Sequence, residues 1–197
     1  MKRVRTAVLI SGRGSNMMAL VEAARPGNFP AEIVLVLSNR PDAEGLDFAS
    51  AIGIANSVVN HKSFPSRDAF EAALQTDLQT LGIELVALAG FMRVLSPGFV
   101  ANWHGRILNI HPSLLPSYRG LHTHERALAD GAIRHGCSVH HVSAELDAGE
   151  IILQAEVPVL VGDTPETLAA RVLVQEHRIY PQALEIVARE LQAKIST

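Results

Sequence analysis

The sequence has a single cysteine, Cys137, among its 197 residues, which excludes an internal disulfide framework. Such a composition suits a reducing compartment, and we expect a cytoplasmic protein. No metal-ligand spacing surrounds Cys137, so we interpret it as a small, partly buried hydrophobic residue.

Long hydrophobic runs and an excess of positive charge are also missing. The basic start "MKRVR" is followed by an apolar stretch, Ala7 to Ile10, that is too short for a signal-peptide core. The run "VALAGF" falls far short of the roughly 20 residues that a membrane span needs. The net charge is −3, which provides no basic field for nucleic acid. We therefore expect a soluble protein with small-molecule partners, no nucleic acid and no membrane, as a monomer or homodimer.

Repeats, low-complexity tracts and linkers are absent too, so we expect a single domain over residues 1–197. Short apolar runs alternate with helical patterns over the first two-thirds of the chain. This alternation predicts an α/β fold, a doubly wound, mostly parallel Rossmann-like sheet with helices on both faces. Strands are expected at residues 6–10, 31–39, 56–60, 84–90 and 105–111, and helices at 16–24, 45–53 and 67–81.

The pattern changes near residue 136. The runs "CSVHHVSAE" and "GEIILQAEVPV", joined by "LDAG", predict two antiparallel C-terminal strands. Thr164 is then expected to cap a helix that begins at Pro165, as Ser66 is expected to cap the helix from Arg67. Pro181 is expected to break the C-terminal region into two helices.

A glycine-rich turn, "SGRGSN" at residues 11–16, follows the first expected strand. Glycines let backbone N–H groups approach an anion, and a helix N-terminus adds a favourable partial charge, so the turn fits a phosphate monoester. The alternative is a tight turn that binds nothing. A dinucleotide site is disfavoured because Met17 stands where a third glycine belongs, and because Ser38 to Arg40 include no acid.

No serine or cysteine lies in a nucleophile-elbow motif, so an attacking group would have to belong to a substrate. Asn109 and His111 lie two apart on an expected strand and should project from the same face. An amide donor beside an imidazole suits the stabilisation of an oxyanion, and Asp147 in "ELDAG" could orient the ring. Pro112 and Pro116 should stiffen the loop. The alternative is that these polar groups only cap loops and turns.

Histidine side chains can also bind metal ions, so we considered the remaining histidines as metal ligands. His122 and His124 have no third or fourth ligand at suitable spacing. His140 and His141 are neighbours on an expected strand, so they should face opposite ways and not share a metal.

The motifs "SGRGSN", "GFMRVLSP", "LNIHPSLLP", "GLHTH", "ELDAGEIILQ" and "EHRIYP" occur in an order and spacing that cover essentially the whole chain. In these motifs the sequence resembles the glycinamide ribonucleotide formyltransferases, folate-dependent enzymes of purine synthesis. The resemblance implies transfer of a formyl group from 10-formyltetrahydrofolate to the amine of glycinamide ribonucleotide, directly and without a metal. It also implies a phosphate-binding part over residues 1–100 or so, and a folate and catalytic part over about 88–197.

The resemblance assigns three sets of residues. It implies Asn109, His111 and Asp147 as catalytic residues. It implies Gly14, Ser15, Asn16 and Glu176 as ligands of the ribonucleotide. It implies a folate pocket lined by Arg67, Met92, Arg93, Val94, Leu95, Asn109, Ala144, Glu145 and Asp147. Arg13 departs from the residue expected in relatives, and its cation would strengthen the attraction for the phosphate. Arg119 and His141 also depart from the expected residues, which leaves the packing beside the folate loop open.

Other functions remain as alternatives. A related enzyme could use another acceptor, a sugar nucleotide or water. A formyltransferase for methionyl-tRNA would need a basic C-terminal domain, and a formyltetrahydrofolate hydrolase an additional N-terminal one, whereas the sequence runs from Met1 to Thr197. A non-catalytic nucleotide-binding module would explain the glycine-rich turn but not Asn109 and His111. A dehydrogenase would bind nicotinamide.

Overall fold

The computed structural model describes residues 2–195, so the ends of the expected domain, residue 1 and residues 196–197, lie outside the described residues. Seven strands form one sheet in this part of the chain, in the order β3-β2-β1-β4-β5-β6-β7. The strands are β1 (Val4–Ile10), β2 (Ala31–Ser38), β3 (Ala55–Val58), β4 (Leu85–Leu88), β5 (Ile107–His111), β6 (Arg134–His141) and β7 (Ile151–Pro158). The pairs from β3 to β5 are parallel, and β5–β6 and β6–β7 are antiparallel. This confirms the predicted fold class.

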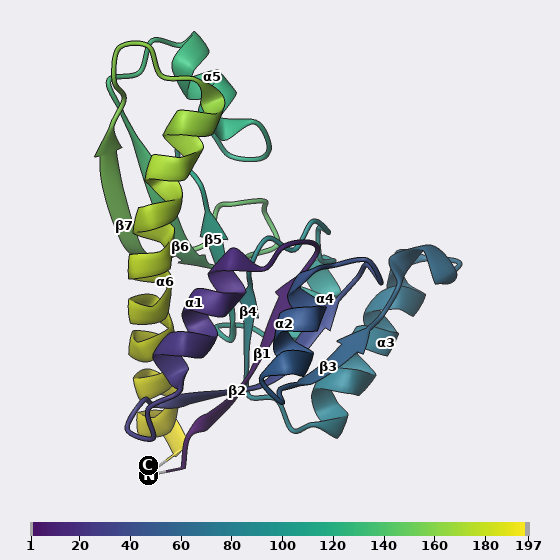
Figure 1. Cartoon of the computed structure of the whole chain (residues 1–197). Helices are drawn as coiled ribbons and strands as arrows, with labels where there is room; N and C mark the ends of the chain where they lie inside the picture. Colours follow the sequence, from purple (N-terminus) through teal and green to yellow (C-terminus); the bar gives the residue numbers. More distant parts are fainter. Residues whose placement is uncertain (1, 196–197) are drawn as a thin grey trace.

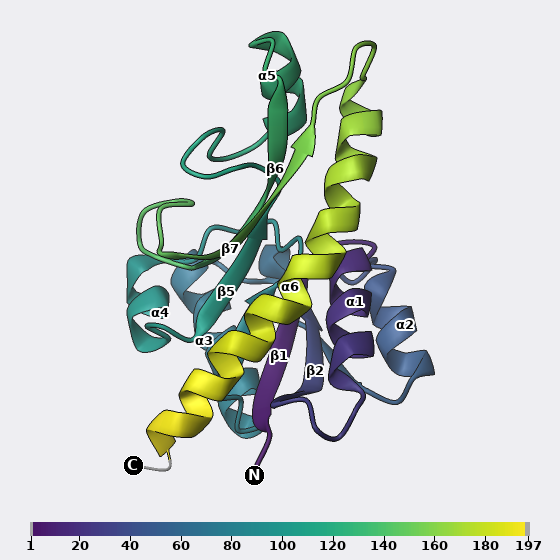
Figure 2. The ribbon, with the colours of Figure 1, turned by 90° about the vertical axis from the view of Figure 1, so that its left-hand side faces the viewer.

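Helices cover both faces of the sheet (Figures 1 and 2). They are α1 (Ser15–Ala24), α2 (Gly45–Ala51), α3 (Arg67–Thr80), α4 (Pro97–Asn102), α5 (Thr123–Ala129) and α6 (Pro165–Ile195), with a short 3-10 turn, η1 (His61–Ser63). Ser66 caps α3 as expected, since its hydroxyl accepts a hydrogen bond from the Ala69 N–H. Within residues 2–195, no helix combines the length and apolar character that a membrane crossing needs.

The core consists of two layers, one on each face of the sheet. Alternate residues of β1 point to opposite faces, so Val8 and Ile10 pack in the layer under α1 and α6, and Ala7 and Leu9 pack in the layer under α3 and α4. The central strands are therefore apolar throughout, which is typical of parallel strands that are buried on both faces.

The prediction that Pro181 separates two helices is wrong. Pro181 lies inside the single helix α6, which changes direction about midway along its length (Figure 2). A proline removes one helical hydrogen bond at a cost of about 3 kcal/mol. Packing of the buried residues Leu184 and Val187 opposes that cost, and the buried Tyr180 donates its hydroxyl proton to the Leu88 carbonyl at 2.9 Å. Tertiary contacts thus keep α6 continuous at Pro181.

The expected short turn "LDAG" between the last two strands is also wrong. Strand β6 ends at His141 and β7 begins at Ile151, so residues 142–150 form a longer loop. This loop returns across β5 far enough for Asp147 to lie beside His111.

Candidate functional site

The candidate site lies where the strand order reverses. Strands β1 and β4 are neighbours, and the chain leaves them to opposite sides of the sheet. In open α/β sheets such a point leaves a crevice outside the carboxyl ends of the strands, where ligands bind. The glycine-rich turn follows β1, the segment Met92–Leu95 comes shortly after β4, and His111 ends β5.

The glycine-rich turn depends on Gly14. Its φ is +76°, and a Cβ there would lie 2.9 Å from Cε of Met17 and 3.2 Å from Cα of Gly45. A larger residue would therefore be strained and crowded. Gly14 is the N-cap residue of α1, which begins at Ser15. No side chain accepts a hydrogen bond from the first N–H groups of this helix. The turn therefore presents backbone donors that an anion can accept.

Asn16 links this turn to α6. Its Nδ2 donates to Oε2 of Glu176 at 2.6 Å, while its Oδ1 is buried and has no hydrogen-bond partner within the described residues. Burial raises the pKa of the Glu176 carboxyl, although the bond from Asn16 opposes this. The structure thus brings Asn16 and Glu176 together beside the turn.

Asn109, His111 and Asp147 form one cluster. Asn109 and His111 project from the same face of β5, as the sequence predicts. Nδ1 of His111 lies 3.5 Å from Oδ2 of Asp147, and both side chains are 8% exposed. In the folded chain the ring and the carboxylate are shielded from water, which strengthens their attraction.

His140 completes the cluster and was not predicted as a site residue. It pairs with Asn109 in the antiparallel register of β5 and β6. Its Nδ1–H donates to the carbonyl of His141 at 2.9 Å, so Nε2 can accept from Nδ2 of Asn109 at 3.2 Å. Burial lowers the pKa of His140, which keeps the ring neutral. No local sequence signal identifies His140, because α5 lies between β5 and β6 and the register of the two strands is not visible before their pairing is known.

Backbone groups of the loop after β5 hold the other side of the cluster. Nε2 of His111 donates to the carbonyl of Tyr118 at 2.9 Å, and the N–H of Gly120 donates to Oδ2 of Asp147 at 2.9 Å. The hydroxyl of Ser138 accepts from the Leu115 N–H at 3.0 Å and anchors the start of the loop to β6. The loop is therefore fixed by hydrogen bonds as well as by its prolines.

The segment implied to line the folate pocket exposes apolar side chains. Met92 is 66% and Val94 60% exposed, whereas Leu95 is buried. Ser96, which follows, is held by buried Glu71, whose carboxylate accepts from the Ser96 N–H at 2.6 Å and from its hydroxyl. An exposed apolar strip on an anchored backbone fits a flat aromatic ligand.

The remaining folate-pocket candidates are exposed. Arg67 is the first residue of α3 and is exposed, and Ala144 and Glu145 are exposed in the loop 142–150. Arg119, one of the departures, pairs with Glu145 through Nη1 and Oε1 at 2.6 Å. Arg119 therefore ties the loop after β5 to the loop that carries Asp147.

His141, another departure, faces away from the cluster. It lines a hollow of about 750 Å³ between α4, the loop 142–150 and the end of α6, together with Val142 and Glu190. Its Nδ1 is buried without a hydrogen-bond partner among residues 2–195. The expectation that His140 and His141 face opposite ways is confirmed.

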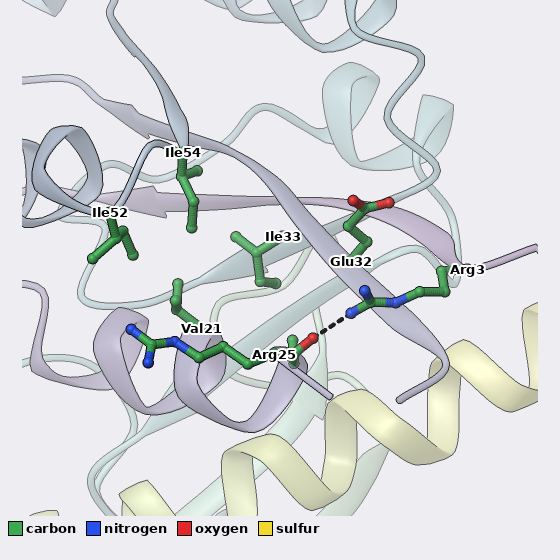
Figure 3. Close-up of a pocket in the computed structure, with 8 residues that line it drawn as sticks. Arg3, Val21, Arg25, Glu32, Ile33, Ile52 and Ile54 are labelled. Carbon is green, nitrogen blue, oxygen red and sulfur yellow. Dashed lines mark hydrogen bonds between the residues drawn. The ribbon is translucent and has the colours of Figure 1, made fainter. Parts of the chain in front are cut away.

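A separate hollow, of about 430 Å³, lies between the end of α1 and the amino ends of β2 and β3 (Figure 3). It is lined by Val21, Ile33 and Ile54 and edged by Arg3, whose guanidinium donates to the carbonyl of Ala24. Because this hollow is near the amino ends of the strands, it is remote from the cluster of polar groups that could do chemistry.

Metal and thiol chemistry find no support among the described residues. No group of three His, Cys, Asp or Glu side chains in residues 2–195 is placed to hold a metal ion. Cys137 is fully buried, and burial raises the pKa of its thiol to about 12. The thiol is therefore protonated and unreactive at neutral pH.

Comparisons with known proteins identify relatives of this chain. The formyl transferase family model matches residues 4–184. The phosphoribosylglycinamide formyltransferase of Escherichia coli (strain K12) is 49% identical over 88% of this chain and 82% of its own length. The crystal structure of phosphoribosylglycinamide formyltransferase from Brucella melitensis is 55% identical, with a TM-score of 0.91 over 95% of this chain and 96% of that one.

A longer relative contains a similar segment. The trifunctional purine biosynthetic protein adenosine-3 of Homo sapiens is 50% identical over 95% of this chain, which spans 18% of that protein's length. The family match extends over nearly all the described residues, including every candidate in the cluster. The chain belongs to the formyl transferase family.

Proposed function

We propose that this chain transfers a formyl group from 10-formyltetrahydrofolate to the amine of glycinamide ribonucleotide, in purine biosynthesis. The observation that carries the proposal is the cluster of Asn109, His111 and Asp147 at the crevice of the sheet. The names of the relatives from Escherichia coli and Brucella melitensis support the choice of acceptor. We place the protein in the cytoplasm, as a monomer or homodimer.

We assign the ribonucleotide to the first part of the domain, about residues 1–100. Gly14, Ser15 and Asn16 would hold its phosphate at the N-terminus of α1, where the uncapped N–H groups favour an anion. Glu176 would contact the same substrate, because its carboxylate lies beside Asn16.

We assign the folate to the part from about residue 88 onward. Met92, Val94 and Leu95 would pack against its ring system, Arg67 and Arg93 would attract its carboxylates, and Ala144 and Glu145 would close the pocket from the other loop. Asn109 faces both substrates. When bound, 10-formyltetrahydrofolate supplies the formyl carbon and the nitrogen that leaves it.

The cluster accounts for catalysis of the transfer. The neutral amine of the ribonucleotide forms a bond to the formyl carbon as the bond from that carbon to the folate nitrogen breaks. Nδ2 of Asn109 has a second N–H, beyond the one given to His140, that can donate to the formyl oxygen as it gains charge. His111 would add a second donor once its Nε2 leaves the Tyr118 carbonyl, while Asp147 holds Nδ1 on the other side of the ring. The proton lost by the amine ends on the folate nitrogen, so no metal or enzyme-bound formyl group is required.

The test is an assay of tetrahydrofolate formation from 10-formyltetrahydrofolate, with and without glycinamide ribonucleotide. The proposal predicts turnover that requires the ribonucleotide and is lost in Asn109→Ala. Equal turnover without the ribonucleotide would make water the acceptor. Turnover only with an amino-sugar nucleotide would identify that acceptor, and nicotinamide binding in place of turnover would indicate a dehydrogenase.

A further inference from the structure

Arg119 and Glu145 form an ion pair that joins two loops beside the catalytic cluster. One loop follows β5 (residues 112–122), and the other, residues 142–150, carries Asp147. Nη1 of Arg119 donates to Oε1 of Glu145 at 2.6 Å. One residue further on, the Gly120 N–H donates to Oδ2 of Asp147 at 2.9 Å. The ion pair is therefore close in sequence, on both loops, to the hydrogen bond that fixes the Asp147 carboxylate.

Residues 118–120 contact both members of the His111–Asp147 pair. The carbonyl of Tyr118 accepts from Nε2 of His111 at 2.9 Å, and Gly120 donates to Asp147. Arg119 stands between these two residues. Because the three residues are consecutive, a shift of the Arg119 backbone would displace the contacts on either side of it. The conformation of this short segment therefore decides where Asp147 lies relative to His111.

Both loops hold a residue in an unfavourable backbone conformation. Tyr118 has φ +56° and Asp147 has φ +50°, in the left-handed region that side chains other than glycine rarely adopt. Such conformations persist only where surrounding contacts hold them. The hydroxyl of Ser143 donates to the carbonyl of Glu145 at 2.8 Å, which fixes the first half of the second loop. The ion pair lies between the two strained residues, so it opposes relaxation of either loop.

Arg119 is itself anchored to α5. Nη1 of Arg126 donates to the carbonyl of Arg119 at 2.7 Å and to that of Leu121 at 3.4 Å. Cζ of Arg126 also lies 5.5 Å from the centroid of the Tyr118 ring, which is a cation–π contact. Arg126 thus fixes the main chain of this segment to a helix. Contacts therefore run from α5 through Arg119 to loop 142–150.

The exposure of the ion pair indicates a local effect. The side chains of Arg119 and Glu145 are 40% and 73% exposed. Ion pairs that are so exposed add little to the stability of a whole fold. Local opening of a loop costs far less free energy than global unfolding, so a small contribution changes how often the loop opens. The pair therefore acts on the position of the two loops and not on the fold.

We propose that Arg119 is a positioning residue, which keeps Asp147 beside His111 through its ion pair with Glu145. For its effect on catalysis, the inference rests on the proposed function. While the ion pair is formed, the Gly120 N–H stays on the Asp147 carboxylate. When the pair is broken, the two loops separate more often and that hydrogen bond opens.

The first test measures loop opening, apart from turnover. Hydrogen exchange of the Gly120 amide is followed by NMR in the wild type, Arg119→Gln and the matched control Arg134→Gln. Arg134 forms an exposed ion pair with Glu156 at the first residue of β6, so the control removes the same kind of contact elsewhere. An exposed ion pair changes an equilibrium by roughly 1.5- to 5-fold. We therefore expect Gly120 to exchange about 2- to 5-fold faster in Arg119→Gln, and at the wild-type rate in Arg134→Gln.

Two further comparisons identify the ion pair as the cause. Glu145→Gln should give the same increase as Arg119→Gln, and the double variant should be no worse than either single variant. KCl at 0.5 M should speed the exchange of Gly120 in the wild type and have little effect in Arg119→Gln. Equal exchange of Gly120 in the wild type and Arg119→Gln, or multiplied increases in the double variant, would overturn the inference, whether or not formyl transfer is found.

The second test separates positioning from a general structural role. Arg119→Gln should lower kcat by about 2- to 5-fold and leave the KM for the ribonucleotide unchanged. Arg119→Lys should restore most of the loss, since it retains the charge. In the Asp147→Asn background, Arg119→Gln should lower kcat no further, because the charge that it positions is gone. A loss that persists there would overturn the inference. Faster exchange of Gly120 in Arg119→Gln, in a protein that transfers no formyl group, would overturn only the proposed function.

Discussion

Oδ2 of Asp147 lies 3.5 Å from Nδ1 of His111 and also accepts the Gly120 N–H at 2.9 Å. The carboxylate is therefore fixed by the loop after β5 before any substrate binds. Asp147 has φ +50°, in the left-handed region that few non-glycine residues adopt. A functional site is where such backbone strain is tolerated.

This relationship predicts that His111 and Asp147 act as one unit. His111→Ala and Asp147→Asn should each lower kcat by roughly 10²- to 10⁴-fold, and the double variant should be scarcely worse than the poorer single variant. The measurement is kcat/KM for the wild type, both single variants and the double variant. Multiplicative losses would show that the two residues act independently.

Asn109→Ala should lower kcat by about 10²- to 10³-fold, because it removes a donor to the developing oxyanion. His140→Ala should lower kcat less, since His140 orients the Asn109 amide. Most of its effect should vanish in the Asn109→Ala background, and the remainder would come from its contact with Oδ1 of Asp147 at 3.7 Å. A loss confined to KM, with kcat preserved, would make Asn109 a binding residue and contradict the catalytic role.

The sequence predicts the positions of the cluster residues on β5 better than the position of His140 on β6. Asn109 and His111 are both on β5, and alternation along a strand places them on one face. His140 depends on the register between β5 and β6, which a sequence does not reveal before the pairing is known. The contact of Asp147 with His111 depends in turn on the path of a nine-residue loop (142–150).

The glycine-rich turn and Pro181 show which structural features can be predicted from local sequence and which cannot. The spacing of Gly14 and Ser15 is a local property, and the structure places both at the start of α1 as expected. Whether Pro181 ends a helix depends on distant partners, and here the contact of Tyr180 with β4 keeps α6 continuous. Local rules therefore fail where burial supplies the stability.

The proposed role of the glycine-rich turn predicts that a substitution there changes the KM for the ribonucleotide and not the KM for the folate. Ser15→Asp places a negative charge where the phosphate is proposed to bind, and repulsion should raise the KM for the ribonucleotide by about tenfold or more, with the KM for the folate unchanged. Ser15→Ala is the control and should have a much smaller effect. If Ser15→Asp left the KM for the ribonucleotide unchanged, the turn would be only structural.

Buried histidines predict how stability depends on pH. Burial lowers the pKa of His135 from 6.5 to about 4, and the nearby His124 contributes to the shift. Between these values the unfolded chain binds a proton that the folded chain does not, so the free energy of unfolding should fall as the pH is lowered from about 6.5 to about 4. We expect His135 to contribute about 2 kcal/mol of this fall, after allowing for screening by solvent near His124.

Urea unfolding across this pH range measures the effect. His135→Gln should make the fall shallower, and the exposed His122→Gln should not change it. A fall of equal size in His135→Gln and the wild type would show that other groups cause it.

The most direct test of the account follows the formyl carbon itself. 10-Formyltetrahydrofolate labelled with ¹³C in the formyl group is mixed with the protein and glycinamide ribonucleotide, and the product is observed by NMR. The account predicts that the label appears on the glycinamide nitrogen, in step with tetrahydrofolate formation, and that Asn109→Ala and His111→Ala nearly abolish this. Label recovered as free formate, or transfer that persists in both variants, would contradict it.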